Sequence, residues 1–327
     1  DPEMLGRIFE NLLAEINPET GESARKSTGS YYTPRVIVDY MVDESLYLYL
    51  KNKTNIEEEK LRSLISYDLD DDTHTPLTEG EKERIIFAID ELKILDPACG
   101  SGAFPMGALQ KIVFILQQLD PNGQYWFKAQ MKSVSIELRK NLEREHSEKN
   151  FNYIRKLGVI RRNIFGVDIQ PIATEISRLR CFLTLIVDQR VDDSKENRGI
   201  DPLPNLDFKF VTANSLISLP SIEKMGKKIG GIEMFEGMDK INELKDIRDQ
   251  FFNASNSERI KLEGKFRKIQ SEMSKYYNSV KSAGAELTEM LLSWDPFSHK
   301  TTGWFDPVWM FGIKGGFDIV IGNPPYG

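Results

Sequence analysis

Apolar positions recur at helical spacing within residues 1–90. One stripe over residues 3–16 predicts an amphipathic helix, and another predicts a helix over residues 81–89. Thr33 followed by Pro34 is typical of a helix start, with Thr33 as the N-cap and Pro34 in the first turn. The inward residues of that helix are predicted to be Ile37, Tyr40, Met41 and Leu46. We therefore expect residues 1–90 to form a helical N-terminal region.

After Leu92 the pattern changes to short apolar runs separated by longer helical stretches. The first run ends in a glycine-rich turn and leads into an apolar helical pattern over residues 103–119. A second run is followed by a helix that begins at Pro171. The four predicted strands lie at 93–95, 163–168, 208–212 and 317–321. Strand, turn and helix in this order predict an α/β domain with a parallel sheet over residues 91–327.

A long insertion separates the third and fourth predicted strands. Within residues 221–300, two segments keep helical spacing on either side of a polar turn at 253–257, which predicts an inserted α-hairpin. Its inward positions are predicted to be Ile241, Leu244, Ile247, Phe251, Leu262, Phe266, Ile269, Met273 and Tyr276. The lysines and arginines of the hairpin are typical of a solvated helix face, and a nucleic-acid contact is the alternative.

Composition agrees with a folded chain of about two domains. The 327 residues are 40% hydrophobic and 28% charged, and no apolar run is long enough to span a membrane. The net charge of −7 does not itself indicate nucleic-acid binding, although a local basic surface can still bind DNA. Residues 1–20 lack a signal-peptide pattern, and two cysteines cannot build a disulfide framework. We expect a cytoplasmic protein.

We expect no metal site. His74, His146 and His299 lie far apart and lack the spacing of zinc ligands. The acidic stretch 68–79 places carboxylates as a calcium loop does, but Thr73 stands where that loop needs glycine. A solvated loop is therefore the favoured interpretation of this stretch.

Unusual residues follow the predicted strands, at the edge where open parallel sheets bind ligands. After the first strand, Gly100 and Gly102 allow a backbone to approach a ligand closely, and a structural tight turn is the alternative. Asp96 begins this turn. A carboxylate repels a phosphate and attracts an ammonium or sulfonium group, so Asp96 favours S-adenosylmethionine over NAD or ATP.

Asp168 ends the second predicted strand, where an acid can bind both hydroxyls of a ribose. It lies much farther along the chain from the glycine-rich turn than the usual distance of ~20 residues, so a helical insertion must separate them. The alternative role for Asp168 is to cap the helix that begins at Pro171.

The fourth predicted strand leads into Asn323-Pro324-Pro325-Tyr326. Two prolines cannot continue a ladder, so the chain leaves the sheet in a stiff, extended form. The Asn323 amide oxygen and the Pro324 carbonyl then become neighbouring acceptors, and Tyr326 supplies a flat ring. Such a set suits the exocyclic amino group of a planar base, and an ordinary proline turn is the alternative.

Together these motifs resemble the amino-group DNA methyltransferases that make N6-methyladenine, in particular the large methylase regions of restriction–modification enzymes. The matching stretches, in the family's order, are 29–34, 95–104, 165–171, 203–216 and 315–326. The resemblance implies a Rossmann-like class I methyltransferase fold, a parallel-rich sheet with flanking helices, that uses S-adenosylmethionine. It also implies methyl transfer to N6 of an adenine that is flipped out of double-stranded DNA.

The resemblance assigns roles to individual residues. The catalytic motif corresponds to Asn323, Pro324, Pro325 and Tyr326. The segment that lines the methionine end of the cofactor corresponds to Tyr32, Thr33 and Pro34. The loop around the amino-acid part of the cofactor corresponds to Asp96, Pro97, Ala98, Gly100, Gly102 and Phe104.

The same resemblance places three residues at the nucleoside part of the cofactor. Asp168 matches the ribose-binding acid, and Ile169 matches the residue beside the adenine ring. Asn214 matches the position that contacts the adenine amino group, where many relatives carry Asp. An amide oxygen can still accept that hydrogen bond, but without the strength that a charge adds.

One departure from the family concerns the end of the sequence. Relatives continue past the catalytic motif into further strands and a target recognition domain, whereas this sequence stops at Gly327. We therefore expect the C-terminal strands to be missing and the isolated chain to be inactive on DNA. A target recognition module and a nuclease, fused or separate, are the expected partners.

Several alternatives stay open. Enzymes that methylate N4 of cytosine, a glutamine side chain or RNA use similar motifs, and the cytosine enzymes more often carry Ser in place of Asn323. The segment 31–34 and the glycine-rich turn favour DNA adenine. A non-catalytic subunit that binds cofactor or DNA is the alternative from another class. Intact Asp96, Asp168 and Asn323 argue against it.

Overall fold

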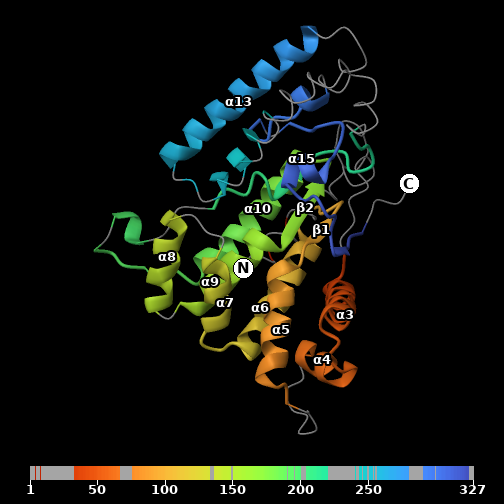
Figure 1. Cartoon of the computed structure of the whole chain (residues 1–327), viewed down its shortest axis with the longest axis vertical. Helices are drawn as coiled ribbons and strands as arrows, with labels where there is room; N and C mark the ends of the chain where they lie inside the picture. Colours follow the sequence, from red (N-terminus) through yellow and green to blue (C-terminus); the bar gives the residue numbers. More distant parts are fainter. Residues whose placement is uncertain are drawn as a thin grey trace. The chain divides into compact units, whose positions relative to one another are not determined.

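The chain folds as an α/β protein in a computed structural model (Figure 1). The structure describes residues 33–66, 76–132, 136–148, 150–189, 191–194, 196–199, 204–219, 240, 243–244, 246–248, 250–252, 254, 256–279, 290–298 and 300–323, together with Met4 and Ile8. Apart from Met4 and Ile8, which are helical, the predicted helix over 3–16 lies outside these ranges. So do most of the acidic stretch 68–79 and the residues 324–327.

Helices make up most of the described chain. The α-helices are α3 (Arg35–Thr54), α4 (Glu58–Ile65), α5 (Glu79–Glu91), α6 (Ala103–Leu119), α7 (Gln124–Met131), α8 (Ile136–Ser147), α9 (Phe151–Arg162), α10 (Pro171–Ile186), α13 (Asn256–Ser279) and α15 (Pro307–Phe311). A 3-10 helix, η1, spans Glu196–Gly199. The strands are β1 (Ile94–Asp96), β2 (Ile164–Asp168), β3 (Phe210–Thr212) and β4 (Ile319–Val320).

The four strands form one sheet in the order β3-β2-β1-β4. β1 pairs in parallel with β2, in the register Ile94↔Ile164, and with β4, in the register Ile94↔Ile319. Because these strands are parallel, their carboxyl ends reach the same edge of the sheet. Each strand overlaps one of the predicted apolar runs, and α6 spans the helix expected after the glycine-rich turn. The α/β prediction with a parallel sheet is confirmed.

The chain divides into two compact units. Unit 1 comprises Asp1–Gly166, Ala173–Asp201 and Phe317–Gly327, and unit 2 comprises Val167–Ile172 and Pro202–Gly316. The division falls within β2 and near the start of α10. Unit 1 therefore carries β1, β4 and helices α3 to α9, and unit 2 carries β3, α13 and α15.

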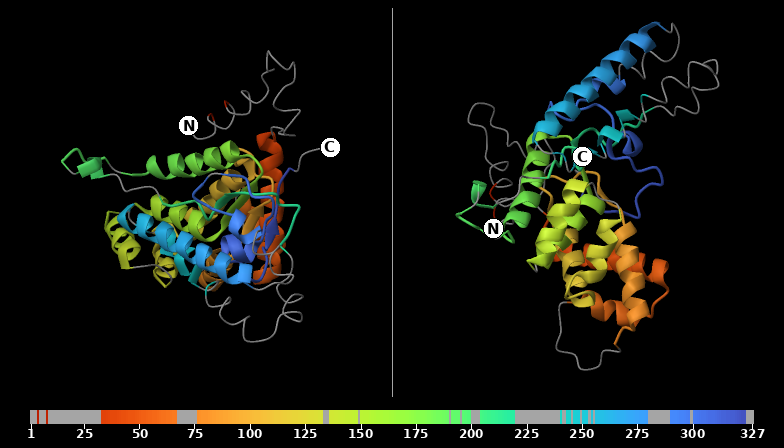
Figure 2. Two further views of the ribbon diagram at one scale, coloured as in Figure 1. Left: turned by 90° about the horizontal axis from the view of Figure 1, so that it is seen from above. Right: turned by 60° about the vertical axis from the view of Figure 1, so that its left-hand side comes forward.

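Helix α6 is central to unit 1, where it contacts both α3 and α9 (Figures 1 and 2). Gly107 lets α3 approach closely, since a Cβ at this position would lie 2.6 Å from Val38 Cγ1. The Lys111 ammonium pairs with the Asp43 carboxylate of α3 at 3.0 Å. Burial lowers the pKa of Lys111, and the bond to Asp43 opposes that shift. The close approach at Gly107 and the ion pair at Lys111 thus both hold α3 against α6.

The start of α3 differs from the prediction. Pro34 is the N-cap and the helix begins at Arg35, so the expected capping role of Thr33 is wrong. The Pro34 carbonyl accepts hydrogen bonds from the backbone amides of Ile37 and Val38. The Thr33 side chain is therefore not needed as a cap and makes a different contact, described below.

The buried face of α3 also differs from the prediction. Ile37 and Tyr40 are 46% and 66% exposed, whereas Val38 and Val42 are buried. Leu46 is buried as predicted. Because α3 carries apolar residues on both faces, helical periodicity alone assigns the wrong stripe at its N-terminal end.

In unit 2 the described residues on either side of the expected turn are helical, as predicted for the inserted hairpin. Helical residues at 243–244, 246–248 and 250–251 precede α13. The predicted inward residues that are buried are Leu244, Ile247, Phe251, Leu262, Phe266, Ile269 and Met273. Phe208, just before β3, contacts the rings of Phe251 and Phe266 at centroid distances of 5.2 and 6.2 Å, so aromatic packing anchors the hairpin.

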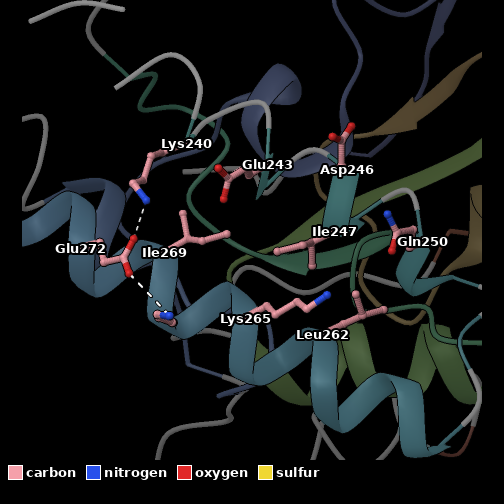
Figure 3. Close-up of a pocket in the computed structure, with 10 residues that line it drawn as sticks. Lys240, Glu243, Asp246, Ile247, Gln250, Leu262, Lys265, Ile269 and Glu272 are labelled. Carbon is pink, nitrogen blue, oxygen red and sulfur yellow. Dashed lines mark hydrogen bonds and ion pairs between the residues drawn. The ribbon is translucent and has the colours of Figure 1, made fainter. Parts of the chain in front are cut away.

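A groove lies between the two arms of the hairpin (Figure 3). Its volume is about 450 Å³, and Ile247, Leu262 and Ile269 form its apolar floor. Lys240 pairs with Glu272 across one end of the groove. Charged side chains of both signs border the groove, which is typical of a solvated helix surface.

Among the described helices, none combines the length and the apolar character that crossing a membrane requires.

Candidate active site

The carboxyl end of β1 leads into the glycine-rich turn in unit 1. Asp96 is 2% exposed, and its Oδ1 accepts a hydrogen bond from the Ala98 backbone amide at 3.1 Å. Gly100 and Gly102 have φ angles of +52° and +87°, which side-chain-bearing residues rarely adopt. The sequence therefore forms this turn because glycine stands at both strained positions. A buried carboxylate lies at its start.

Helix α10 holds this turn from one side. The Ser177 hydroxyl donates to the Gly100 carbonyl at 3.0 Å, and the Arg180 guanidinium donates to the Ser101 carbonyl at 2.7 Å. A Cβ at Gly102 would lie 2.9 Å from Ser177 Oγ, so glycine is also needed for this close approach. The motif analysis missed both side chains of α10. Their signal in the sequence is weak, because other polar residues such as Glu175 and Arg178 lie in the same helix.

The carboxyl end of β4 meets the same turn. The Ile321 backbone amide donates to the Leu95 carbonyl at 2.9 Å, which continues the pairing of β4 with β1 past the end of the strand. A Cβ at Gly322 would lie 2.6 Å from Asp96 Oδ1. The chain just before the predicted catalytic motif thus lies against the Asp96 carboxylate. Gly322 was not among the predicted site residues.

Asn323 also contacts the segment before α3. Its Nδ2 donates a hydrogen bond to Thr33 Oγ1 at 3.2 Å, between residues 290 apart in the sequence. Thr33 is 8% exposed, and Asn323 is half-buried. Unit 1 therefore brings together three predicted segments: the Thr33 segment, the Asp96 turn and the start of the catalytic motif.

Unit 2 holds the residues predicted for the nucleoside part of the cofactor. The Ala213 backbone amide donates to the Asp168 carbonyl at 2.9 Å, which brings Asp168 close to Asn214. Asp168 Oδ1 accepts from the Gln170 amide at 2.8 Å, and Asn214 Oδ1 accepts from the Leu216 amide at 3.0 Å. These bonds shape both strand ends into tight turns. The alternative of Asp168 as a cap for α10 is not tested by them.

A family model for the Eco57I restriction-modification methylases matches residues 162–327, which is just over half of the chain. The chain belongs to this family. The match begins at the end of α9 and includes β2, β3, β4 and the predicted catalytic motif. The predicted resemblance to the methylase regions of restriction–modification enzymes is thereby confirmed.

A relative of this Eco57I-type methylase is found in Methanocaldococcus jannaschii. It is RM.MjaORFECS2P, whose name describes a type II restriction enzyme and methyltransferase. The two sequences are 30% identical over 223 residues. That stretch covers 66% of this chain but only 16% of the relative.

The remaining predicted site residues differ in their placement. Phe104 is buried in the first turn of α6, whereas Pro97 and Ala98 are partly exposed. Pro34 is exposed at the start of α3, and Ile169 is 53% exposed after β2. The predicted residues Tyr32, Pro324, Pro325 and Tyr326 lie outside the described residues.

The chain has two cysteines, and both are buried. Cys99 is a buried residue of the turn itself. Cys181 follows Arg180 in α10, and burial raises the pKa of its thiol to about 12. The Cys181 thiol therefore stays protonated near neutral pH and is not a nucleophile there.

Within the described ranges, no three His, Cys, Asp or Glu side chains come together in a group that could hold a metal ion.

Proposed function

We propose that this chain carries the cofactor-binding and catalytic part of a DNA methyltransferase that acts on N6 of adenine. Two contacts carry the proposal: the close approach of Gly322 to the Asp96 carboxylate, and the hydrogen bond from Asn323 to Thr33. The strand order β3-β2-β1-β4 supports a Rossmann-like class I fold, in which ligands bind beyond the carboxyl ends of the strands.

The residues of unit 1 fit S-adenosylmethionine. Asp96 offers a buried carboxylate for a positively charged group, and it would hold the amino-acid part of the cofactor with the Gly100–Gly102 turn. A Cβ at Gly100 would meet no atom within 4 Å, so the turn has open space beside it. Asp168, Ile169 and Asn214 are the proposed contacts of the nucleoside part. The bound cofactor would supply an electrophilic methyl group on a sulfonium.

Asn323 would act on the target nitrogen. The N6 nitrogen of adenine is a poor nucleophile because its lone pair is delocalised into the ring. Hydrogen bonds from N6–H to the Asn323 amide oxygen and the Pro324 carbonyl would localise that lone pair. They would also stabilise the positive charge that develops on the nitrogen. The chain thus needs no nucleophilic side chain, and positioning supplies most of the rate enhancement.

The target adenine has to leave the DNA duplex before Asn323 can reach it. Unstacking costs a few kcal/mol, and stacking on the Tyr326 ring would return ~1–3 kcal/mol. We further propose a target recognition module and a nuclease as partners, fused to this chain or separate, acting on DNA in a prokaryotic cytoplasm. The name of the methanogen relative, a restriction enzyme and methyltransferase, supports this arrangement.

The proposal is tested with Asn323→Ala in the full-length enzyme. We expect methyl transfer from labelled S-adenosylmethionine to DNA to fall by about 10²- to 10³-fold, because a preorganised acceptor is lost. Cofactor affinity, measured by calorimetry, should stay within about twofold of wild type. Asn52→Ala, at an exposed position of α3, is the matched control and should leave both values unchanged. Unchanged turnover in Asn323→Ala would contradict the catalytic assignment.

A further inference from the structure

The contact between Thr33 and Asn323 joins a residue before the first described helix to the first residue of the catalytic motif. The hydrogen bond of 3.2 Å runs from Asn323 Nδ2 to Thr33 Oγ1. Thr33 is buried to 8% exposure, so water competes little for its hydroxyl. A contact between residues 290 apart in sequence exists only because the fold brings the two segments together.

Thr33 is held in place by the packing of the helix that follows it. The Pro34 N-cap leads directly into α3, and Val38, one turn later, packs against Gly107 of α6. The ion pair between Asp43 and Lys111 fastens the next turn of α3 to the same helix. Since α6 begins directly after the Asp96–Gly102 turn, the Thr33 hydroxyl has a defined position relative to that turn.

Asn323 is held from its other side. The backbone amide of Ile321 pairs with Leu95 at the end of β1, and the Gly322 backbone lies against Asp96. The main chain at Asn323 is therefore placed by the sheet. The side-chain torsions remain free, and the last of them, which turns the carboxamide, is broad and roughly two-fold.

The two ends of a carboxamide are chemically different. The oxygen accepts hydrogen bonds and the nitrogen donates them, so only one of the two orientations offers an acceptor to a target amino group. With Nδ2 bound to Thr33, Oδ1 is on the opposite branch of the amide. None of the described residues donates a hydrogen bond to Asn323 Oδ1.

We propose that Thr33 is a positioning residue that holds Nδ2 of the Asn323 amide, which leaves the amide oxygen to accept from the target amino group. This inference rests on the proposed function, in which Asn323 is the acceptor. It differs from the role that the family resemblance implies for Thr33, which is to line the methionine end of the cofactor. The two roles predict different effects of the same substitutions.

The experiment compares Thr33→Val and Thr33→Ser in the full-length enzyme. Valine keeps the shape of threonine but cannot bind the amide, whereas serine keeps the hydroxyl. Thr54→Val is the matched control, because Thr54 lies at the far end of α3 and its hydroxyl donates to the Leu50 carbonyl at 2.7 Å. The measured quantities are kcat and KM for DNA, and the Kd of S-adenosylmethionine.

We expect kcat of Thr33→Val to fall by about tenfold to a hundredfold, as a misplaced catalytic group does. Its Kd for S-adenosylmethionine should stay within about twofold, and Thr33→Ser should keep most of the activity. Thr54→Val should match wild type in kcat and Kd. A Thr33→Val enzyme with normal kcat at saturating cofactor but weakened cofactor binding would overturn the inference.

A second set of variants tests whether Thr33 acts through Asn323. In an Asn323→Ala background the side chain that Thr33 holds is absent, so adding Thr33→Val should change the rate of single-turnover methyl transfer by no more than about twofold. An equal loss in the presence and absence of the Asn323 amide would contradict the inference.

Other failures have separate signatures. If Thr33→Val does not fold, Thr33→Ala replaces it in the comparison. If both variants are unfolded while Thr33→Ser is folded, the Thr33 hydroxyl is needed for folding. That result would also contradict a positioning role. A wild-type enzyme that transfers no methyl group, or an Asn323→Ala enzyme with normal turnover, would refute the proposed function instead.

Discussion

Among the described glycines of the candidate site, Gly322 has the least room for a side chain. A Cβ there would lie 2.6 Å from Asp96 Oδ1, which is closer than real Cβ contacts allow. The Asp96 carboxylate is itself buried and bonded to the Ala98 amide, so it has little freedom to move away. Glycine is therefore required at this position if the Asp96 carboxylate is to keep its place.

This requirement leads to a prediction for Gly322→Ala. The added methyl group should displace the Asp96 carboxylate and weaken binding of S-adenosylmethionine by about tenfold, which corresponds to ~1.4 kcal/mol. Calorimetry on the full-length enzyme measures the effect. Gly315→Ala is the matched control, because a Cβ at Gly315 would meet nothing within 4 Å. Equal affinities in the two variants would show that Asp96 does not bind the cofactor.

Single residues of the candidate site could be predicted from the sequence, but their contacts with one another could not. Asp96 and Asn323 stand out because a carboxylate in a glycine turn and an asparagine before two prolines are chemically unusual. The bond from Asn323 to Thr33 could not be predicted, because it joins segments at opposite ends of the sequence. Gly322 was missed for the same reason, since its role depends on a neighbour that comes from β1.

At the scale of elements, α10 supports the glycine-rich turn of the candidate site. Arg180 is buried, and its guanidinium satisfies the Ser101 carbonyl within the glycine-rich turn. Removal of this buried donor takes a hydrogen bond from the Ser101 carbonyl, at a cost of about 1–3 kcal/mol. The turn would then lose the contact that holds it against α10.

We expect Arg180→Ala to weaken binding of S-adenosylmethionine by about tenfold or more, with a smaller effect for Ser177→Ala. Arg180→Lys should bind with intermediate affinity, because an ammonium cannot reproduce the planar fork of arginine. Arg178→Ala, at the neighbouring and more exposed arginine of α10, is the control. If Arg180→Ala lowers the melting temperature but binds the cofactor normally, α10 supports the fold alone.

Element types were predictable where the apolar pattern had one interpretation. The strands are short apolar runs next to glycine or acidic residues, and their number and place followed from the sequence. The face of α3 was not predictable, because exposed Ile37 and Tyr40 and buried Val38 and Val42 are both pairs at helical spacing. Only the packing of α3 on Gly107 of α6 decides between these two stripes.

At the scale of the whole molecule, the predicted site residues fall in both units. Unit 1 carries Thr33, Asp96 and Asn323, and unit 2 carries Asp168 and Asn214. The family was predictable from motif order alone and is confirmed by the match to the Eco57I methylases. The boundary expected at residue 90 and the roles of the individual site residues stay predictions.

The most direct test of the account is to identify the modified base in DNA. DNA from cells that express the full-length gene, with wild-type Asn323 or with Asn323→Ala, is digested and its nucleosides are separated by mass. We predict N6-methyladenine that depends on wild-type Asn323, at one recurring sequence when the same DNA is mapped. N4-methylcytosine in its place, or N6-methyladenine that persists in Asn323→Ala, would contradict the account.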